Sequence, residues 1–220
     1  MSDPQPSLDL AIGEDASSAI ALDLPDADIT LLPLFLRRDD ADRLLTEVAD
    51  TTPWRQELIT LYGRQSPVPR LTAWHGDPQA VYTYSNIAME PEPWSAPLLE
   101  IRALVEAEAA TRFNSVLCNL YRHGRDSVAW HSDDEAELGP RPVIASVSLG
   151  DTRTFQLRHR TRSELRHQIE LSHGCLLLMR GATQRHWKHQ ISKTARPVGR
   201  RINLTYRTVL TGGPDHRLCM

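Results

Sequence analysis

The chain has 220 residues, of which 40% are hydrophobic and 24% charged, values typical of one globular domain and not of a disordered protein. Its longest strongly apolar run, residues 175–179, falls far short of the roughly twenty residues that a bilayer helix needs, so we expect no membrane association. The first ten residues do not resemble a secretory signal, and three well-separated cysteines form neither a disulfide framework nor a CxxC metal site. We therefore expect a reduced, soluble, cytoplasmic protein, and we expect a monomer.

The formal net charge of −3 is unevenly distributed along the chain. Residues 1–28 contain seven acids and no Lys or Arg, which indicates a flexible acidic tail. Between Arg153 and Arg207, thirteen Lys or Arg residues face only two acids, a net charge of +11. Such an excess fits a polyanionic partner, or else a solvated Arg-rich surface.

Two helices are expected in the first half of the folded body. Asp39 or Asp40 can cap a helix that runs to about Asp50, stops before Pro53 and buries Leu44, Leu45 and Val48. Residues 55–86 are rich in Pro, Gly and aromatic side chains, which predicts short strands and hairpins. Ser95 then opens a second helix to about Arg112, with Pro97 in its first turn. Its apolar stripe consists of Leu98, Ile101, Leu104 and Val105.

From Asn114 onward, short alternating runs separated by turns replace the helical pattern. The runs predict strands at about 115–121, 127–132, 142–149, 153–159, 166–171, 175–180, 184–191 and 201–209. About eight strands after two helices predict an α+β fold in which a double-sheet barrel carries helices on its outside.

A possible metal site begins with His131-Ser132-Asp133, because residues two apart in a strand point to the same face. A third ligand would have to come from the segment 185–189, where both His186 and His189 are available. Two histidines and one carboxylate form the facial arrangement of non-haem Fe(II) oxygenases, and they also suit a catalytic zinc ion. The HxD motif alone is weak evidence.

The strand at 201–207 places Arg201, Asn203, Thr205 and Arg207 on one face and apolar side chains on the other. If the Arg face is exposed, it is an ordinary solvated surface. If it points into the barrel, the two guanidinium groups require a buried anion, because an unpaired buried charge is very costly. Two arginines can bind a dicarboxylate, and Asn119 and Tyr121 place two further hydrogen-bonding groups on one face of another strand.

Several stretches together resemble the AlkB-type Fe(II)/2-oxoglutarate-dependent dioxygenases, and most closely their DNA-repair demethylase branch. The resemblance covers about residues 30–209 and rests on PRLTAWHGD (69–77), YTYSN (82–86), NSVLCNLYRHGRDSVAWHSDDEAELG (114–139), ASVSLGDTRTFQLRHR (145–160), GATQRHWKHQI and RINLTYRTV. It implies one domain over 29–220, with a double-stranded β-helix (jelly-roll) core at roughly 114–209. It also implies an N-terminal nucleotide-recognition lid at roughly 54–94.

The resemblance implies specific roles for the candidate residues. Fe(II) would be bound by His131, Asp133 and His189, where His189 is preferred over His186 because Trp187 stands two residues before it. The cosubstrate 2-oxoglutarate would contact Asn119, Tyr121, Arg201 and Arg207, and O2 would be the second cosubstrate.

For the substrate, the resemblance implies alkylated DNA, or RNA. Glu135, rather than Asp134, would meet the exocyclic amine of the base, and Tyr82 and Tyr84 would stack on an everted base. Tyr62 falls where some relatives carry an aromatic hairpin tip. Arg153, Arg158, Arg160 and Arg162 are the candidates for phosphate contacts.

The implied reaction is oxidative demethylation of 1-methyladenine or 3-methylcytosine, with release of formaldehyde and conversion of 2-oxoglutarate to succinate and CO2. Other acceptors for the same chemistry are RNA, a protein side chain or a small molecule. A zinc hydrolase and a non-catalytic nucleic-acid-binding barrel are the remaining alternatives.

Overall fold

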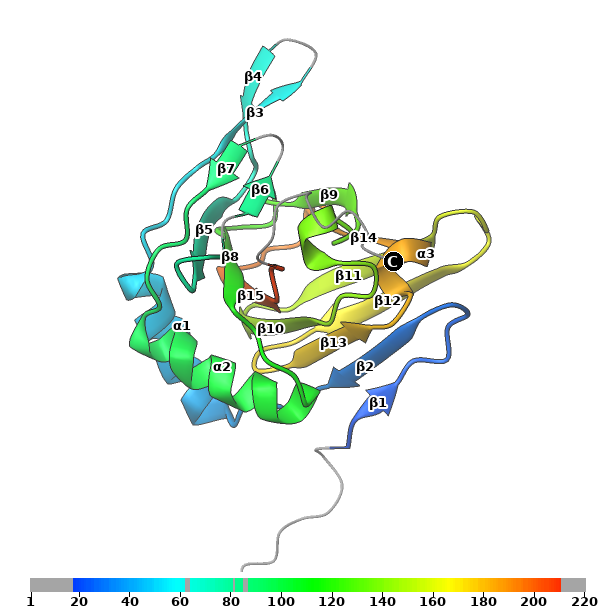
Figure 1. Cartoon of the computed structure of the whole chain (residues 1–220), viewed down its shortest axis with the longest axis horizontal. Coiled ribbons are helices and arrows are strands. Elements are labelled where there is room, and N and C mark those ends of the chain that lie inside the picture. The colour runs from blue at the N-terminus through cyan, green and yellow to red at the C-terminus, as the bar shows by residue number, and fades with distance from the viewer. Residues whose placement is uncertain (1–17, 62–63, 81, 85–86, 211–220) are drawn as a thin grey trace, which may run out of the picture.

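The protein is described by a computed structural model that covers residues 18–61, 64–80, 82–84 and 87–210. Two antiparallel sheets form its centre (Figure 1). The larger sheet contains, in spatial order, β1 (Ile20–Ala21), β2 (Asp28–Leu32), β13 (Leu176–Arg180), β10 (Ile144–Gly150), β15 (Arg201–Arg207), β8 (Ser115–Tyr121) and β5 (Leu71–Gly76). The smaller sheet contains β12 (Arg166–Leu171), β11 (Arg153–His159), β14 (Trp187–Ile191) and β9 (Val128–His131).

Helices and hairpins surround these sheets. The helices are α1 (Arg38–Thr51), α2 (Ala96–Ala109) and the short α3 (Thr183–His186), together with a 3₁₀ turn at Ala136–Leu138. The hairpins are β3 (Leu58–Leu61) with β4 (Arg64–Pro67), and β6 (Tyr82–Tyr84) with β7 (Ile87–Met89). Both hairpins lie within the segment 54–94, for which a lid was predicted, and they project beyond one end of the sheets (Figure 1). Their function as a lid stays a prediction.

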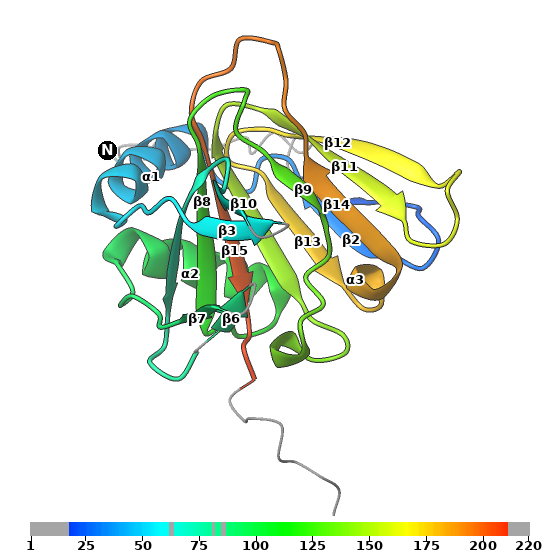
Figure 2. The same ribbon diagram turned by 90° about the horizontal axis from the view of Figure 1, so that it is seen from above.

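The three layers are a pair of helices, the larger sheet and the smaller sheet (Figure 2). One core lies between the helices and the outer face of the larger sheet, and it includes Leu44, Ile101, Val147 and Leu204. A second core lies between the two sheets. Its members include Ile29, Trp74, Ile144, Phe155, Leu157, Leu177 and Trp187. The predicted jelly-roll barrel with outer helices is therefore confirmed.

The two long helices lie close to their predicted positions. Asp39 and Asp40 were predicted as possible caps of α1, but the N-cap position is Arg37, and both acids instead lie in the first turn, where the helix dipole favours them. The helix ends two residues before Pro53. In α2, Pro97 lies in the first turn, and the helix ends at Ala109, three residues earlier than predicted. Its buried stripe is narrower than expected, because Leu104 is 44% exposed.

Two segment boundaries differ from the sequence prediction. The predicted strand at 184–191 begins as α3, and strand geometry starts only at Trp187. Within the predicted acidic tail, Ile20–Ala21 forms β1 and pairs with β2, so the folded body begins earlier than residue 29. Residues 1–17 lie outside the described part. No helix in the described ranges combines the length and apolarity that a bilayer crossing requires.

Candidate metal centre

Three potential metal ligands meet at one end of the smaller sheet. His131 is the last residue of β9, Asp133 follows two residues later, and His189 lies within β14. His131 and His189 are direct neighbours across the β9–β14 pair, and their rings are 4.2 Å apart. One ligand atom from each of the three residues lies within 4.8 Å of the others. The other candidate, His186, is in α3 and does not join this group.

Hydrogen bonds and charges prepare these groups to bind a cation. The Nδ1 atom of His131 is 2.8 Å from the carbonyl oxygen of Ala129, so the ring donates there and its Nε2 lone pair remains available. Burial lowers the pKa of His189 to about 3, which keeps this imidazole neutral at physiological pH.

The ligand carboxylate is ionised despite its complete burial. Burial alone would raise the pKa of Asp133, but the nearby Arg207, followed by His189 and His131, lowers it. Arg207 Nη2 donates to Asp133 Oδ1 at 2.6 Å, whereas Asp133 Oδ2 faces His189 Nε2 at 3.5 Å. One carboxylate oxygen is thereby engaged and the other points toward the histidines.

The donor set of two imidazoles and one carboxylate fits a divalent iron ion. This combination is the 2-His-1-carboxylate facial triad, which leaves open coordination positions for other ligands.

Beyond the metal ligands, Arg201 provides a buried cation without a matching acid. Its side chain is 1% exposed, Nη2 donates to Ser148 Oγ at 2.9 Å, and the Tyr121 side chain is a further hydrogen-bonding neighbour. Neither Nε nor Nη1 has a hydrogen-bond partner in the described part of the chain. Its guanidinium carbon lies 5.2 Å from the ring centroid of Tyr121, its register partner on β8. A buried guanidinium with open donors is suited to bind an anion.

Asn119 lies between the arginine and the metal ligands, opposite Asn203 in the β8–β15 pair. Its Oδ1 accepts a hydrogen bond of 2.6 Å from Arg70 Nε, which assigns the orientation of the amide and leaves Nδ2 as a donor. Arg70 is itself 5% exposed.

A single cavity joins the metal ligands to the buried arginines. It is lined by the predicted residues of both sites. Its walls carry the guanidinium groups of Arg70, Arg201 and Arg207 and the carboxylates of Asp133 and Glu135. Arg201 and Arg207 both line this cavity and are buried, so the Arg face of β15 is not a solvated surface.

Two acids next to the metal ligands have different environments. Asp134 is exposed and forms an ion pair of 2.5 Å with Arg160. Glu135 lines the cavity, and its Oε2 is buried without a hydrogen-bond partner among the described residues. Glu135 is therefore the carboxylate that can accept a hydrogen bond from a molecule in the cavity.

The remaining predicted substrate residues have other positions. Tyr82 and Tyr84 lie on β6, but their side chains, like all of Tyr62, fall outside the described part. Arg153 is 3% exposed and donates to the carbonyl oxygens of Asp126 and Ser192, at 3.0 and 2.7 Å. In this position it supports the sheet, and its contacts do not suggest a phosphate ligand.

The sequence did not single out three residues of this site. Arg70 was available as an isolated charge before a buried strand, and Ser148 as a polar residue within an apolar strand. No sequence pattern marks Gln184 as a site residue, because it lies in α3 and its contact with Asp133 depends on tertiary structure.

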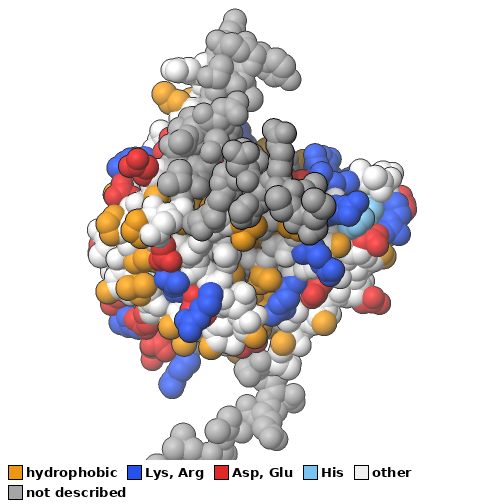
Figure 3. All heavy atoms as spheres, viewed as in Figure 1, with side chains coloured by type: hydrophobic (Ala, Val, Ile, Leu, Met, Phe, Trp, Pro, Cys, Tyr) orange, Lys and Arg blue, Asp and Glu red, His pale blue; other side chains and the backbone are white. Residues whose placement is uncertain are grey.

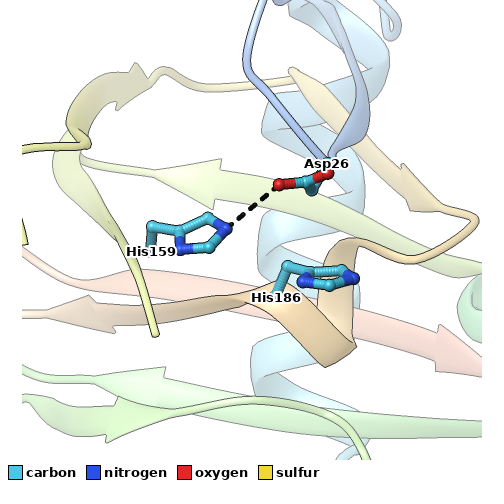
Figure 4. Close-up of side chains that lie close together, drawn as sticks. All are labelled: Asp26, His159 and His186. Atoms are coloured by element: carbon cyan, nitrogen blue, oxygen red, sulfur yellow. Dashed lines mark hydrogen bonds and ion pairs between the residues drawn. The ribbon is translucent and has the colours of Figure 1, made fainter. Parts of the chain in front are cut away.

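A second group of possible metal ligands, Asp26, His159 and His186, lies near the beginning of β14 (Figure 4). The Nδ1 atom of His159 accepts from the backbone N–H groups of Thr161 and Arg162, at 3.3 and 3.2 Å. The Nε2 atom of His159 lies 3.3 Å from both Asp26 Oδ2 and Arg162 Nη2. Because both ring nitrogens of His159 already have polar partners and Arg162 also binds Asp26, we assign this group to hydrogen bonding and not to metal binding.

Comparisons with known proteins agree with this geometry. A family model described as the 2OG-Fe(II) oxygenase superfamily matches residues 28–207. Alpha-ketoglutarate-dependent dioxygenase alkB homolog 3 from Rattus norvegicus is 43% identical over 198 residues, which cover 86% of this chain and 65% of that protein. The Homo sapiens protein of the same name is also 43% identical, with 68% of its length covered. The chain thus spans about two thirds of the length of these curated relatives.

More distant relatives extend the comparison. DNA oxidative demethylase ALKBH2 from Homo sapiens is 38% identical over 159 residues, which cover 69% of this chain and 61% of that protein. Among solved structures, one titled "The structure of OsALKBH1" has a TM-score of 0.62 at 18% identity and covers 87% of this chain and all of that one. A prolyl hydroxylase from Trichoplax adhaerens has a TM-score of 0.57 at 13% identity, covering 82% and 83%. These two structures show a shared fold.

Proposed function

The chain belongs to the 2OG-Fe(II) oxygenase superfamily, in its AlkB-type branch, and on this premise we propose that it demethylates N-alkylated nucleobases in DNA. The reaction would consume one O2 and one 2-oxoglutarate for each methyl group. The N-methyl carbon would leave as formaldehyde, the ring nitrogen would regain its lone pair as the cationic base loses a proton, and 2-oxoglutarate would become succinate and CO2. We propose 1-methyladenine and 3-methylcytosine as the lesions.

The chain's own residues would hold the two reactants that drive this oxidation. His131, Asp133 and His189 would bind Fe(II), which supplies the oxidation of a C–H bond by O2 when 2-oxoglutarate is present. Arg207 keeps Asp133 ionised and fixes one of its oxygens, so that the other oxygen faces the metal position.

The buried arginine is the single observation that carries the assignment. Arg201, with Tyr121 beside it, would bind the distal carboxylate of 2-oxoglutarate through its open donors. Asn119, oriented by Arg70, would donate its Nδ2 hydrogen to the same molecule. The cavity walls exclude water from the bound diacid, which strengthens these charge interactions. A zinc hydrolase would have no use for such a dicarboxylate site.

Glu135 is the proposed contact to the alkylated base. A base methylated at N1 of adenine or N3 of cytosine carries a positive charge and an exocyclic amine, and both are complementary to a carboxylate. Glu135 has an oxygen available in the cavity, whereas Asp134 is occupied by Arg160. Because the methyl group lies on the Watson–Crick edge, the base must enter the cavity from a single strand or by eversion from a duplex.

The outer face of the smaller sheet offers a surface for the nucleic-acid backbone. Arg158 on β11 stands opposite Lys188 on β14 and Arg166 on β12, so these three cations form a row across the sheet. Arg158 also lies 4.4 Å from the ring centroid of Trp130, the neighbour of His131. Figure 3 shows Lys and Arg side chains gathered on this side of the molecule. Cations and an aromatic ring beside a cavity fit a polynucleotide strand.

The test is the release of formaldehyde from methylated oligonucleotides. The purified protein, supplied with Fe(II), ascorbate and 2-oxoglutarate, should demethylate 3-methylcytosine or 1-methyladenine in DNA and form succinate in equal amount. Matched RNA oligonucleotides in the same competition assay distinguish the alternative substrate. Conversion of 2-oxoglutarate without demethylation of either polymer would instead favour a protein or small-molecule acceptor, and a His131→Ala variant provides the inactive control.

A further inference from the structure

The strand pairing that brings His131 and His189 together ends at these two residues. The β9–β14 pair has only the contacts His189–His131 and Ile191–Val128 in register, with a shift between them. Strand β9 ends at His131, so the backbone N–H and C=O groups of Ser132 and Asp133 are not paired with a neighbouring strand. Both are nevertheless buried, at 7% and 3% exposure, and need partners inside the protein.

Two hydrogen bonds connect Ser132 and Asp133 to the segment before His189, beyond the end of the strand pair. Ser132 Oγ donates to the carbonyl oxygen of Trp187 at 2.8 Å, and the backbone N–H of Asp133 donates to Gln184 Oε1 at 2.9 Å. Both acceptors belong to the short segment that leads into His189. The two metal-bearing segments are thus joined a second time, beyond the end of their strand pair.

Gln184 is held firmly enough to act as a reference point. Its side chain is 2% exposed, and its Nε2 donates to Met179 Sδ at 3.4 Å, which turns Oε1 toward Asp133. The preceding Thr183 bonds to the backbone N–H of Asp28 at 2.9 Å, and Trp187 Nε1 donates to the carbonyl oxygen of Pro25 at 2.9 Å. The beginning of β2 therefore fixes the turn from which Gln184 extends.

We infer that Gln184 is a positioning residue for the metal, because it sets where Asp133 stands relative to His189. This inference rests on the metal site of the proposed function. Arg207 holds only Oδ1 of Asp133, and a second constraint on the backbone is needed to direct Oδ2 toward the histidines. Without the Gln184 carbonyl, the buried N–H of Asp133 would lack an acceptor, and the residue would shift to find one.

The direct test measures metal affinity in a variant that lacks the acceptor. Gln184→Met keeps the length and volume of the side chain but removes Oε1. Titration calorimetry with Mn(II), in the presence of 2-oxoglutarate, should give a dissociation constant about 10- to 100-fold weaker than that of the unchanged protein. Gln190→Met is the matched control, because Gln190 follows His189 directly but bonds to Gln156 and not to Asp133. It should retain its affinity.

A second readout separates positioning from general stability. A purely structural role would lower the melting temperature of the metal-free and the Mn(II)-loaded protein equally. The inferred role reduces the rise in melting temperature that Mn(II) causes, since that rise follows from affinity. If Gln184→Met does not fold, Gln184→Asn, whose shorter amide cannot reach Asp133, is measured in its place and should show the same loss.

Either outcome is decisive. Mn(II) affinity within threefold of the unchanged protein in the folded variant overturns the inference for Gln184 and leaves the proposed function intact. Failure of the unchanged protein to bind Mn(II) overturns the metal site itself.

Discussion

Replacing Arg201 by methionine should have opposite effects on stability and on cosubstrate binding. Arg201 is a buried cation that donates to Ser148 and lies beside Tyr121, and two of its nitrogens lack hydrogen-bond partners among the described residues. In the absence of ligand, its charge therefore opposes folding. The Arg201→Met variant removes this charge while keeping a side chain that fills similar space.

The expected magnitudes follow from these contacts. Loss of the charged hydrogen bond costs about 1.5–3 kcal/mol, but removal of an uncompensated buried charge relieves several kcal/mol. We expect the ligand-free variant to gain about 1–2 kcal/mol of unfolding free energy, which corresponds to a rise of roughly 2–8 °C in melting temperature. Binding of 2-oxoglutarate should lose about 2–5 kcal/mol, or about 30- to 5,000-fold in affinity.

The assay combines two measurements on protein dialysed free of metal and diacid. Differential scanning calorimetry gives the melting temperature, and titration calorimetry with Mn(II) present gives the dissociation constant of 2-oxoglutarate. A variant that melts below the unchanged protein, or binds 2-oxoglutarate equally well, would refute the assignment of Arg201 as an unpaired anion-binding group.

Four further predictions concern separate parts of the molecule. Glu135→Gln should lower kcat/KM for 3-methylcytosine DNA by about 10- to 100-fold, equivalent to about 1.4–2.8 kcal/mol, while the affinity for 2-oxoglutarate stays unchanged. A kcat/KM equal to that of the unchanged protein would show that Glu135 does not recognise the base. The double variant Arg158→Ala/Lys188→Ala should bind oligonucleotides of every sequence more weakly, and the slope of log K against log salt concentration, measured by fluorescence anisotropy, should fall in magnitude by about 1.4 for single strands. An unchanged slope would mean that the nucleic-acid strand binds elsewhere on the protein. Burial alone would raise the pKa of Glu106, but bonds from the Phe113 N–H, Arg102 and Arg112 lower it, so its stabilisation is present above the unfolded pKa and is lost as pH falls through the lower folded value. In urea unfolding, Glu106→Gln should cost about 1.5–3 kcal/mol at pH 7, and this cost should shrink as the pH is lowered; a pH-independent cost would contradict the assigned charge. Ile101→Ala, fully buried, should cost about 2–5 kcal/mol, whereas Leu104→Ala, 44% exposed, should cost less than about 1 kcal/mol; similar costs would mean that α2 packs through a different face.

Alternation along strands accounts for most of what could be predicted from the sequence. The alternation from Arg201 to Arg207 predicted that both arginines lie on one face of the strand. In the structure this strand is buried on both faces, so the arginine face is buried as well. The same reasoning applies to Arg153, which shares its face with Phe155 and Leu157 in β11 and is buried with them. Its assignment to phosphate binding considered local charge and left out this alternation.

Contacts between distant segments account for what could not be predicted. Ile20–Ala21 forms a strand only because β2 is beside it, and neither residue is itself buried. Gln184 gains its contact with Asp133 through α3, a single helical turn that interrupts the alternation before β14. The choice between His186 and His189 likewise required a family resemblance, since the predicted strand at 184–191 contained both residues.

The most direct test of the metal centre is an anomalous diffraction map from crystals grown with Fe(II) and 2-oxoglutarate without O2. The account predicts one iron peak between His131, Asp133 and His189, with the diacid chelating the metal and its far carboxylate against Arg201. Iron at Asp26, His159 and His186 instead, or a diacid bound away from Arg201, would contradict it.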